Sequence, residues 1–237
     1  MRSWITALLT ATVLGAAPAF ADATSLQIMP INIEVPAPGA ASKVTITNSG
    51  SKTANIQARV FKWVQKNGKD ELVETRDVVA SPPAVKLGAG KKSVIRVVRV
   101  NKTPAANEET YRLVIDDIAA PRKSGDAAIG FSVRHSLPVF FTAADDEVEL
   151  NWKAAIKDGK LVVTASNSGD RRVRLTDLKV AGKGGKAISF GSGLSGYVLG
   201  RSSKVWIAKS KSISPGAVIK ILAQSDHGSV ETTAKVQ

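Results

Sequence analysis

Much of the chain alternates apolar and polar residues with a period of two. The clearest example is ANIQARVFKWVQK, residues 54–66, where apolar side chains recur at every second position from Ile56 to Val60. Side chains two apart in a strand share a face, so such runs predict half-buried strands. No stretch has a helical period of useful length, and we predict an all-β protein. In the first half, strands are expected at 25–35, 43–50, 54–66, 93–100, 111–118 and 129–141.

A second series of short strands begins near residue 146, with Gly, Ser or Asp turns between the strands. About seven strands in roughly 120 residues is the spacing of a β-sandwich. We therefore expect two domains of one architecture, with the boundary at TAADDE, residues 142–147. The expected domain ranges are 22–143 and 146–237.

Residues 1–21 have the features of a secretory signal peptide. Arg2 precedes the apolar run WITALLTATVLGAA, and AFA fits the small-x-small cleavage rule. The run is shorter than the roughly 20 apolar residues that a membrane span needs. We expect cleavage after Ala21, export, and no insertion into a membrane.

Composition narrows the function classes further. The chain has no cysteine and a formal net charge of +13. An exported protein without disulfides must hold each domain together by burial, and thiol catalysis and cysteine-ligated metal are excluded. The positive charge either keeps the protein soluble or attracts an anionic partner or surface. Nucleic acid is a poor candidate because aromatic content is low and no nucleic-acid motif appears.

Catalytic residues are scarce. The two histidines are His135, within an expected strand, and His227, in the turn-like SDHGS. A Ser-His-Asp triad needs a base held by an acid and facing a serine, and no nucleophile-elbow motif is present. Two distant histidines do not suggest a zinc site. We therefore expect a protein that is not an enzyme and has no cofactor or metal.

The stretch IGFSVRHSLPVFFTA, residues 129–143, raises a specific question. Ile129, Phe131 and Val133 place bulky apolar side chains on one phase, and His135 interrupts the row. These side chains either cover the core of their own domain or enter another protein. The alternation by itself favours the first interpretation.

Several segments, in the same order along the chain, resemble periplasmic chaperones of the chaperone–usher pathway, the PapD-like family. The most specific match is ASPPAVKLGAGKKSVIRVVR, beside SLQIMPINIEVPA, KVTITNSG, YRLVIDDI and SLPVFFTA. RVFKW, YRLVID and LPVF are most similar to the archaic, Csu-type branch. The resemblance covers essentially the whole chain after the signal peptide.

The resemblance implies two immunoglobulin-like domains in an L-shaped arrangement and a periplasmic location. It also implies that the last strand of the first domain completes the sandwich of a pilus subunit, which is then delivered to an outer-membrane usher. On this alignment the donor strand is 129–141, and Ile129, Phe131 and Val133 are the donor side chains.

The chain departs from the family at the subunit anchor. PapD-like chaperones hold the C-terminal carboxylate of the pilus subunit with an Arg in the first strand and a Lys in the donor strand. Asn32 and Pro138 occupy these positions here. Arginine suits bidentate carboxylate binding, and solvated strand faces are the alternative role. The candidates for an anchor are Arg96, Arg99, Arg112 and Arg134.

Two alternative functions remain open. A secreted immunoglobulin-like adhesion or polysaccharide-binding protein would use Trp63 or Trp152 as a sugar platform, although core packing is the default for both. A pilin is disfavoured by two full domains and by the lack of an N-terminal donor extension.

Overall fold

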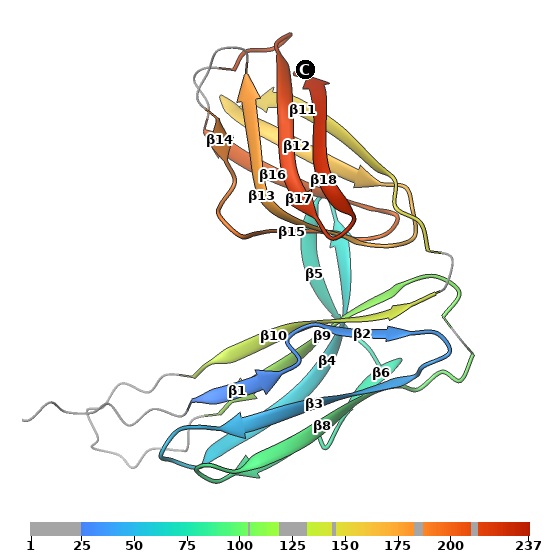
Figure 1. The fold of residues 1–237 in the computed structure, drawn as a ribbon, viewed down its shortest axis with the longest axis vertical. Coiled ribbons are helices and arrows are strands. Elements are labelled where there is room, and N and C mark those ends of the chain that lie inside the picture. The colour runs from blue at the N-terminus through green and yellow to red at the C-terminus, as the bar shows by residue number, and fades with distance from the viewer. Residues whose placement is uncertain (1–24, 104, 119–131, 144–145, 183–186, 210–212) are drawn as a thin grey trace, which may run out of the picture.

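The computed structural model describes residues 25–103, 105–118, 132–143, 146–182, 187–209 and 213–237. All regular elements in these ranges are β-strands, which confirms the all-β prediction. The strands form two sandwiches, one above the other in Figure 1, with the strands of the lower sandwich running across the picture and most of those above running up it. None of the described residues forms a helix long and apolar enough to cross a membrane.

The first sandwich contains a four-stranded and a six-stranded sheet. The four-stranded sheet has the order β1 (Leu26–Met29), β3 (Ala41–Asn48), β8 (Lys92–Arg99), β6 (Val78–Ser81). The other sheet has the order β2 (Ile33–Pro36), β10 (Arg134–Thr142), β9 (Glu109–Asp117), β4 (Ala54–Lys66), β5 (Lys69–Glu74), and β7 (Ala84–Leu87) also pairs with β4.

The second sandwich contains a three-stranded and a five-stranded sheet. The former has the order β11 (Leu150–Lys157), β12 (Lys160–Asn167), β16 (Ser202–Lys209). The latter has the order β14 (Ile188–Ser189), β13 (Val173–Gly182), β17 (Val218–Ser225), β18 (Gly228–Lys235), and β15 (Leu194–Val198) also pairs with β13.

Alternation places one phase of each strand in a core. In the first sandwich, Val44 and Ile95 from one sheet meet Leu113 and Val139 from the other, and all four are fully buried. A buried side chain of this size contributes about 1.5–3 kcal/mol. The second sandwich has a separate core of its own, formed by residues of β11 to β18.

The structure differs from the sequence prediction in three elements. Residues 25–35 form two strands in different sheets, β1 and β2, because the chain crosses between the sheets at 30–32. β5 was not predicted, since all six of its residues are exposed and leave no apolar alternation. β6 and β7 lie in and beside the proline-bearing segment 81–92, which we expected to be an extended connection.

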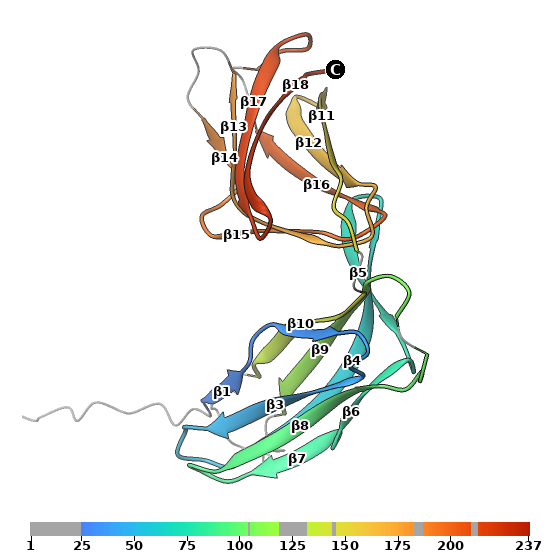
Figure 2. The same cartoon turned by 45° about the vertical axis from the view of Figure 1, so that its right-hand side comes forward.

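The hairpin of β4 and β5 projects from the first sandwich and reaches the second (Figure 2). At its tip, Val205 N donates a hydrogen bond to Gly68 O at 3.1 Å. Gln65 bonds in both directions: its Nε2 donates to Tyr197 O at 2.8 Å, and its Oε1 accepts from Leu199 N at 3.0 Å. The backbone of the second sandwich is thus fixed to one hairpin of the first.

A small apolar cluster seals the joint behind this hairpin. Trp63 and Phe140 from the first sandwich pack with Tyr197 and Leu199 from the second, and all four are buried. The Trp63 and Tyr197 rings meet edge to face, with centroids 5.3 Å apart. Aromatic pairs of this geometry add about 0.5–1.5 kcal/mol beyond their area burial.

Gly68 permits the close approach of the hairpin to β16. Its φ is +75°, and a Cβ at this position would lie 2.2 Å from Cγ2 of Val205. We expect Gly68→Ala to lower the free energy of unfolding by about 1–2 kcal/mol for the left-handed backbone and further for the clash. Urea unfolding measures the total.

Gly159→Ala is the matched control. Gly159 has φ +68° and follows Asp158 at φ 51°, as Gly68 follows Asn67 at φ 51°, but nothing lies within 4 Å of its added Cβ. The excess loss in Gly68→Ala reports the contact between the sandwiches. Equal losses in the two variants would show that the docked hairpin contributes nothing.

Candidate functional site

Strand β10 is paired on both edges only in its second half. Residues 134–141 pair with β9 on one side, and residues 139–142 pair with β2 on the other. Because the chain switches from β1 to β2 at residues 30–32, no strand of the described chain covers the second edge of residues 134–138. A row of backbone donors and acceptors is therefore open there, which makes it a template for another strand.

The backbone ladder shows which groups face this open edge. Asp117 N donates to Val133 O at 3.1 Å, on the β9 side. In an antiparallel pair only alternate residues bond to a given neighbour, so Arg134 and Ser136 direct their N–H and C=O groups away from β9. Thr142 lies an even number of residues after Arg134 and Ser136, so its carbonyl also points away from β9. This carbonyl accepts a hydrogen bond from Ala37 N at 2.9 Å.

The side chains of β10 and those of the residues just before it differ in burial. Leu137, Val139 and Phe141 are buried in the core of the first sandwich. Val133 is 48% exposed and lies with His135 on the wall of a hollow of about 200 Å³. Ile129 and Phe131 lie outside the described residues.

The face of β4, β9 and β10 that points away from the first core forms the floor beside this edge. The pairing places Arg134 next to Asp116, and Pro138 next to Arg112. Arg59 from β4 joins the same face, on which Arg59 and Arg134 both contact Asp116. The sequence analysis named Arg112 and Arg134 as candidates but missed Arg59. Arg59 is four residues before Trp63 in the same strand, so the alternation could have placed both side chains on one face.

Asp116 binds two of these arginines. Arg134 Nε donates to its Oδ1, and Arg59 Nη2 donates to its Oδ2, each at 2.6 Å. The hydrogen bond from Arg134, followed by that from Arg59, lowers the pKa of Asp116 from its ordinary value of 3.8. The carboxylate of Asp116 therefore remains charged at neutral pH. Asp116, Arg59 and Arg134 together carry one positive charge in excess.

Arg112 is placed differently from the other candidates. Its Cζ lies 3.7 Å from the centroid of the Trp63 ring, a cation–π contact, and Nη1 donates to Ser136 O at 3.5 Å. Burial lowers the pKa of its guanidinium. No acidic side chain in the described ranges forms a direct ion pair with it, although the charge of Asp70 opposes the lowering of its pKa, so Arg112 presents a half-buried cation next to β10.

The remaining anchor candidates lie elsewhere. Arg99 is buried, and its guanidinium is bound by Glu109, with Nη2 donating to Oε1 at 2.7 Å, and by the carbonyls of Asn101 and Thr103. Arg96 is exposed on the outer face of the four-stranded sheet, away from β10.

The two positions aligned with the family anchor are separate. Asn32 is exposed where the chain crosses between the sheets, whereas Pro138 is buried in β10 opposite Arg112. Arg112 therefore places its positive charge on β9, next to the position on β10 where the family has a Lys and this chain has Pro138.

The two tryptophans considered as sugar platforms are not open surfaces. Trp63 is 1% exposed and lies in the joint cluster. Trp152 is half-buried and stacks on Trp206, with ring centroids 6.0 Å apart. Trp63 therefore offers no exposed face on which a sugar could stack, and one face of Trp152 is covered by Trp206.

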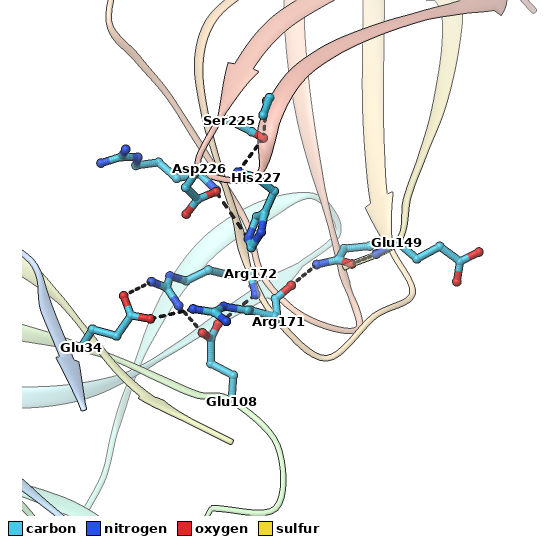
Figure 3. Close-up of polar contacts among 11 residues, drawn as sticks. Glu34, Glu108, Glu149, Arg171, Arg172, Ser225, Asp226 and His227 are labelled. Atoms are coloured by element: carbon cyan, nitrogen blue, oxygen red, sulfur yellow. Dashed lines mark hydrogen bonds and ion pairs between the residues drawn. The ribbon is translucent and has the colours of Figure 1, made fainter. Parts of the chain in front are cut away.

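Ion pairs also fix the joint between the two sandwiches (Figure 3). Arg172 from the second sandwich donates to Glu34 at 2.8 Å and to Glu108, and its Cζ lies 3.6 Å from the centroid of the Phe140 ring. Arg171 donates to Glu34 at 2.9 Å. Burial raises the pKa of Glu108, although Arg172 opposes the shift.

Comparison with solved structures defines the class: immunoglobulin-like, two-domain assembly chaperones. The chain is similar to the CsuC chaperone, crystallised with the CsuE tip adhesion subunit in a pre-assembly complex of archaic Csu pili from Acinetobacter baumannii. Identity is 25%, the TM-score is 0.71, and the match covers 90% of this chain and 99% of that one. The expected fold of two immunoglobulin-like domains in an L, and the likeness to the archaic branch, are confirmed.

Other solved structures share the fold at lower identity. One is a chain in the complex of the Salmonella enterica SafA pilin with the SafB chaperone, at 18% identity and TM-score 0.60, covering 90% of this chain and 95% of that one. Another is the CupB2 chaperone of Pseudomonas aeruginosa, at 16% identity and TM-score 0.53, covering 87% and 97%.

The family model described as pili and flagellar-assembly chaperone, PapD N-terminal domain, matches residues 25–144. The chain belongs to this family of pilus assembly chaperones. No curated protein sequence matches it.

Proposed function

We propose that this protein is a periplasmic chaperone that caps pilus subunits by donor-strand complementation and then delivers them to an outer-membrane usher. The single observation that supports the proposal most strongly is the open edge of β10 at residues 134–138, continued by the exposed Val133. Of the expected donor residues, Val133 directly precedes this edge, and Ile129 and Phe131 come before it in the sequence, outside the described residues.

Strand addition explains how such an edge binds a guest, as known for chaperone–pilin pairs. The backbone groups of Arg134 and Ser136 pair with a guest strand, which supplies the partners that the edge lacks. Apolar side chains two residues apart enter successive gaps in the open core of the guest. Each contributes about 1.5–3 kcal/mol when fully buried, before entropic costs.

The partner class follows from the related complexes. CsuC was crystallised with a tip adhesion subunit and SafB with a pilin. We extend this class to the present protein: its guests are pilus subunits whose sandwich lacks a strand.

We propose Arg112 as the group that binds the C-terminal carboxylate of the guest. Among the four candidates it alone combines a place beside β10, opposite Pro138, with the absence of an ion-pair partner in the described chain. Stacking on Trp63 holds the guanidinium in place, and the donors not used by the bond from Nη1 to Ser136 O are available for a carboxylate. Arg99 and Arg134 already hold Glu109 and Asp116.

The location and processing remain part of the proposal. Residues 1–21 would be removed as a signal peptide, leaving domains at 22–143 and 146–237 in the periplasm. All strands of the first sandwich fall within residues 26–142 and all those of the second within 150–235, which supports these bounds. The proposed role is not enzymatic and requires no cofactor.

Val133→Asp tests the donor strand. Val133 is exposed, so the charge should leave folding intact, but it would be buried without a partner in the guest's core. We expect recovery of the guest on co-purification to fall at least about tenfold, with an unchanged unfolding temperature.

Val218→Asp is the matched control, since Val218 is 59% exposed and lies in the second sandwich. It should recover the guest as the unaltered protein does. Full recovery with Val133→Asp would remove the basis for the donor assignment.

Arg112→Ala tests the anchor. With a peptide that ends in the last residues of a pilin, we expect affinity to fall at least about tenfold, because a charge-assisted hydrogen bond contributes about 1.5–3 kcal/mol. The same peptide with an amidated C-terminus should bind both proteins equally weakly. If amidation weakens binding to Arg112→Ala as much as to the unaltered protein, the carboxylate is held by another residue.

A further inference from the structure

The outer face of the sheet β11-β12-β16, in the second sandwich, carries charge of one sign only. One phase of these strands packs in the core, and the other phase points outward. The outward charged residues are Lys153, Lys157, Lys160 and Lys209, and all four are exposed. No outward position of these three strands holds Asp or Glu. In Figure 2 this sheet lies to the right of β13 and β17, which belong to the other sheet of the same sandwich.

Three of the four lysines stand side by side. The register places Lys160 of β12 between Lys157 of β11 and Lys209 of β16, and we call this set the lysine row. Neighbouring strands are about 4.8 Å apart, and like charges directly opposite each other destabilise a sheet. Asp158 lies in the adjacent turn, but no residue of the described chain forms an ion pair with the lysine row. Folding therefore gains nothing from the row, and its charge is available to an anionic surface.

The outward face of the other sheet in this sandwich has a different arrangement of charge. Lys220 of β17 forms an ion pair with Glu231 of β18, with Nζ 2.6 Å from Oε1. Lys179 of β13 lies in one row with the same glutamate, through Leu222. Lysines on that face are thus compensated by an acidic neighbour, as on an ordinary solvated strand face, whereas the lysine row is not.

The row next to the lysine row is apolar. Ala155, Val162 and Ile207 lie opposite one another across the three strands, and Ile207 is 58% exposed. Successive rows are two residues, or about 6.6 Å, apart. Lys153 belongs to the row on the far side of this apolar row, opposite Thr164. An exposed apolar side chain therefore stands between cations on two sides.

We infer that this face binds the surface of an anionic lipid bilayer. The four lysines lie at the level of the phosphate groups, and Ile207 enters the boundary between head groups and acyl chains. Anionic lipid surfaces attract clusters of about 4–8 basic residues. Each lysine near such a surface strengthens binding about fivefold, which is about 1 kcal/mol. The binding is reversible, and the protein lies on the bilayer without crossing it.

The chemistry of the face favours a bilayer over other anionic partners. All four cations are lysines, whose compact charge on a flexible stem requires no fixed geometry in the partner. Recognition of a single carboxylate favours the planar fork of arginine, which is absent from the outward positions of this sheet. These positions also hold no aromatic ring on which the bases of a single-stranded nucleic acid would stack.

The inference does not rest on the proposed capping of pilus subunits. The open edge of β10 belongs to the first sandwich and the lysine row to the second, so the two surfaces share no residue. Binding to lipid is measured without a pilin, and failure of one proposal leaves the other intact.

Flotation with lipid vesicles tests the inference. The protein without its signal peptide, residues 22–237, contains the strands of both sandwiches and lacks the apolar run that would bind a bilayer by itself. We expect it to float with vesicles of phosphatidylglycerol and phosphatidylcholine in equal parts at low salt, and to be released at high salt. The variant Lys157→Gln, Lys160→Gln, Lys209→Gln should bind at least about tenfold more weakly, with an equal or higher unfolding temperature. Ile207→Ser should weaken binding about threefold or more.

The matched control removes the same charge from the opposite face of the same sandwich. The variant Lys179→Gln, Lys220→Gln, Lys235→Gln changes three exposed lysines of β13, β17 and β18. It is needed because the chain has a formal net charge of +13, which attracts any anionic surface. This control variant should keep at least half of the binding of the unaltered protein.

Three results would overturn the inference. Equal weakening in the two triple variants would show that net charge alone attracts the protein. Equal flotation with pure phosphatidylcholine vesicles would show that the lysines have no part in binding. Binding of free inorganic phosphate in calorimetry, lost in the variant without the lysine row and accompanied by no flotation, would assign the row to a soluble anion.

Discussion

The structure depends on one topological constraint: the first strand of the sandwich changes sheets. β1 pairs with β3, and after the crossing at residues 30–32, β2 pairs with β10. A single strand that stayed beside β10 would cover its whole edge. Because it does not, no strand within the described ranges pairs with this side of residues 134–138, while Leu137 and Val139 hold the strand in the core. The protein thus carries a rigid strand with an open edge, at no cost to its own fold.

The rest of the molecule positions groups around this edge. The β4–β5 hairpin carries Trp63 into the joint, and Trp63 in turn supports Arg112. Ion pairs from Arg172 to the partly exposed Glu34 and to the buried Glu108 fix the second sandwich over the same end of the sheet. Removing one partner of a buried pair such as Arg172 and Glu108 costs about 3–5 kcal/mol, so the position of the second sandwich on the first is strongly determined. A preorganised arrangement of this kind lowers the entropic cost of binding a partner.

Alternation along the sequence was sufficient to predict the all-β class and strands such as β4, β8 and β9, because one face of each is buried. It could not predict β5, whose residues are all exposed, or the division of β1 from β2, which depends on pairing between distant segments. The same limit applies to the arginines. Residue type alone gave four equal candidates, and only the fold shows that Arg99 meets Glu109 and Arg134 meets Asp116, while Arg112 meets an aromatic ring.

Amide hydrogen exchange at Arg134 and Ser136, followed by NMR, tests the central claim most directly. Both N–H groups point away from β9 at the uncovered part of β10. We expect fast exchange in the free protein and a slowing of at least about 100-fold in the complex with a pilin, as each amide joins a guest strand. Exchange at both amides that is unchanged by a bound pilin would contradict the account, because the guest would then be held by some other surface.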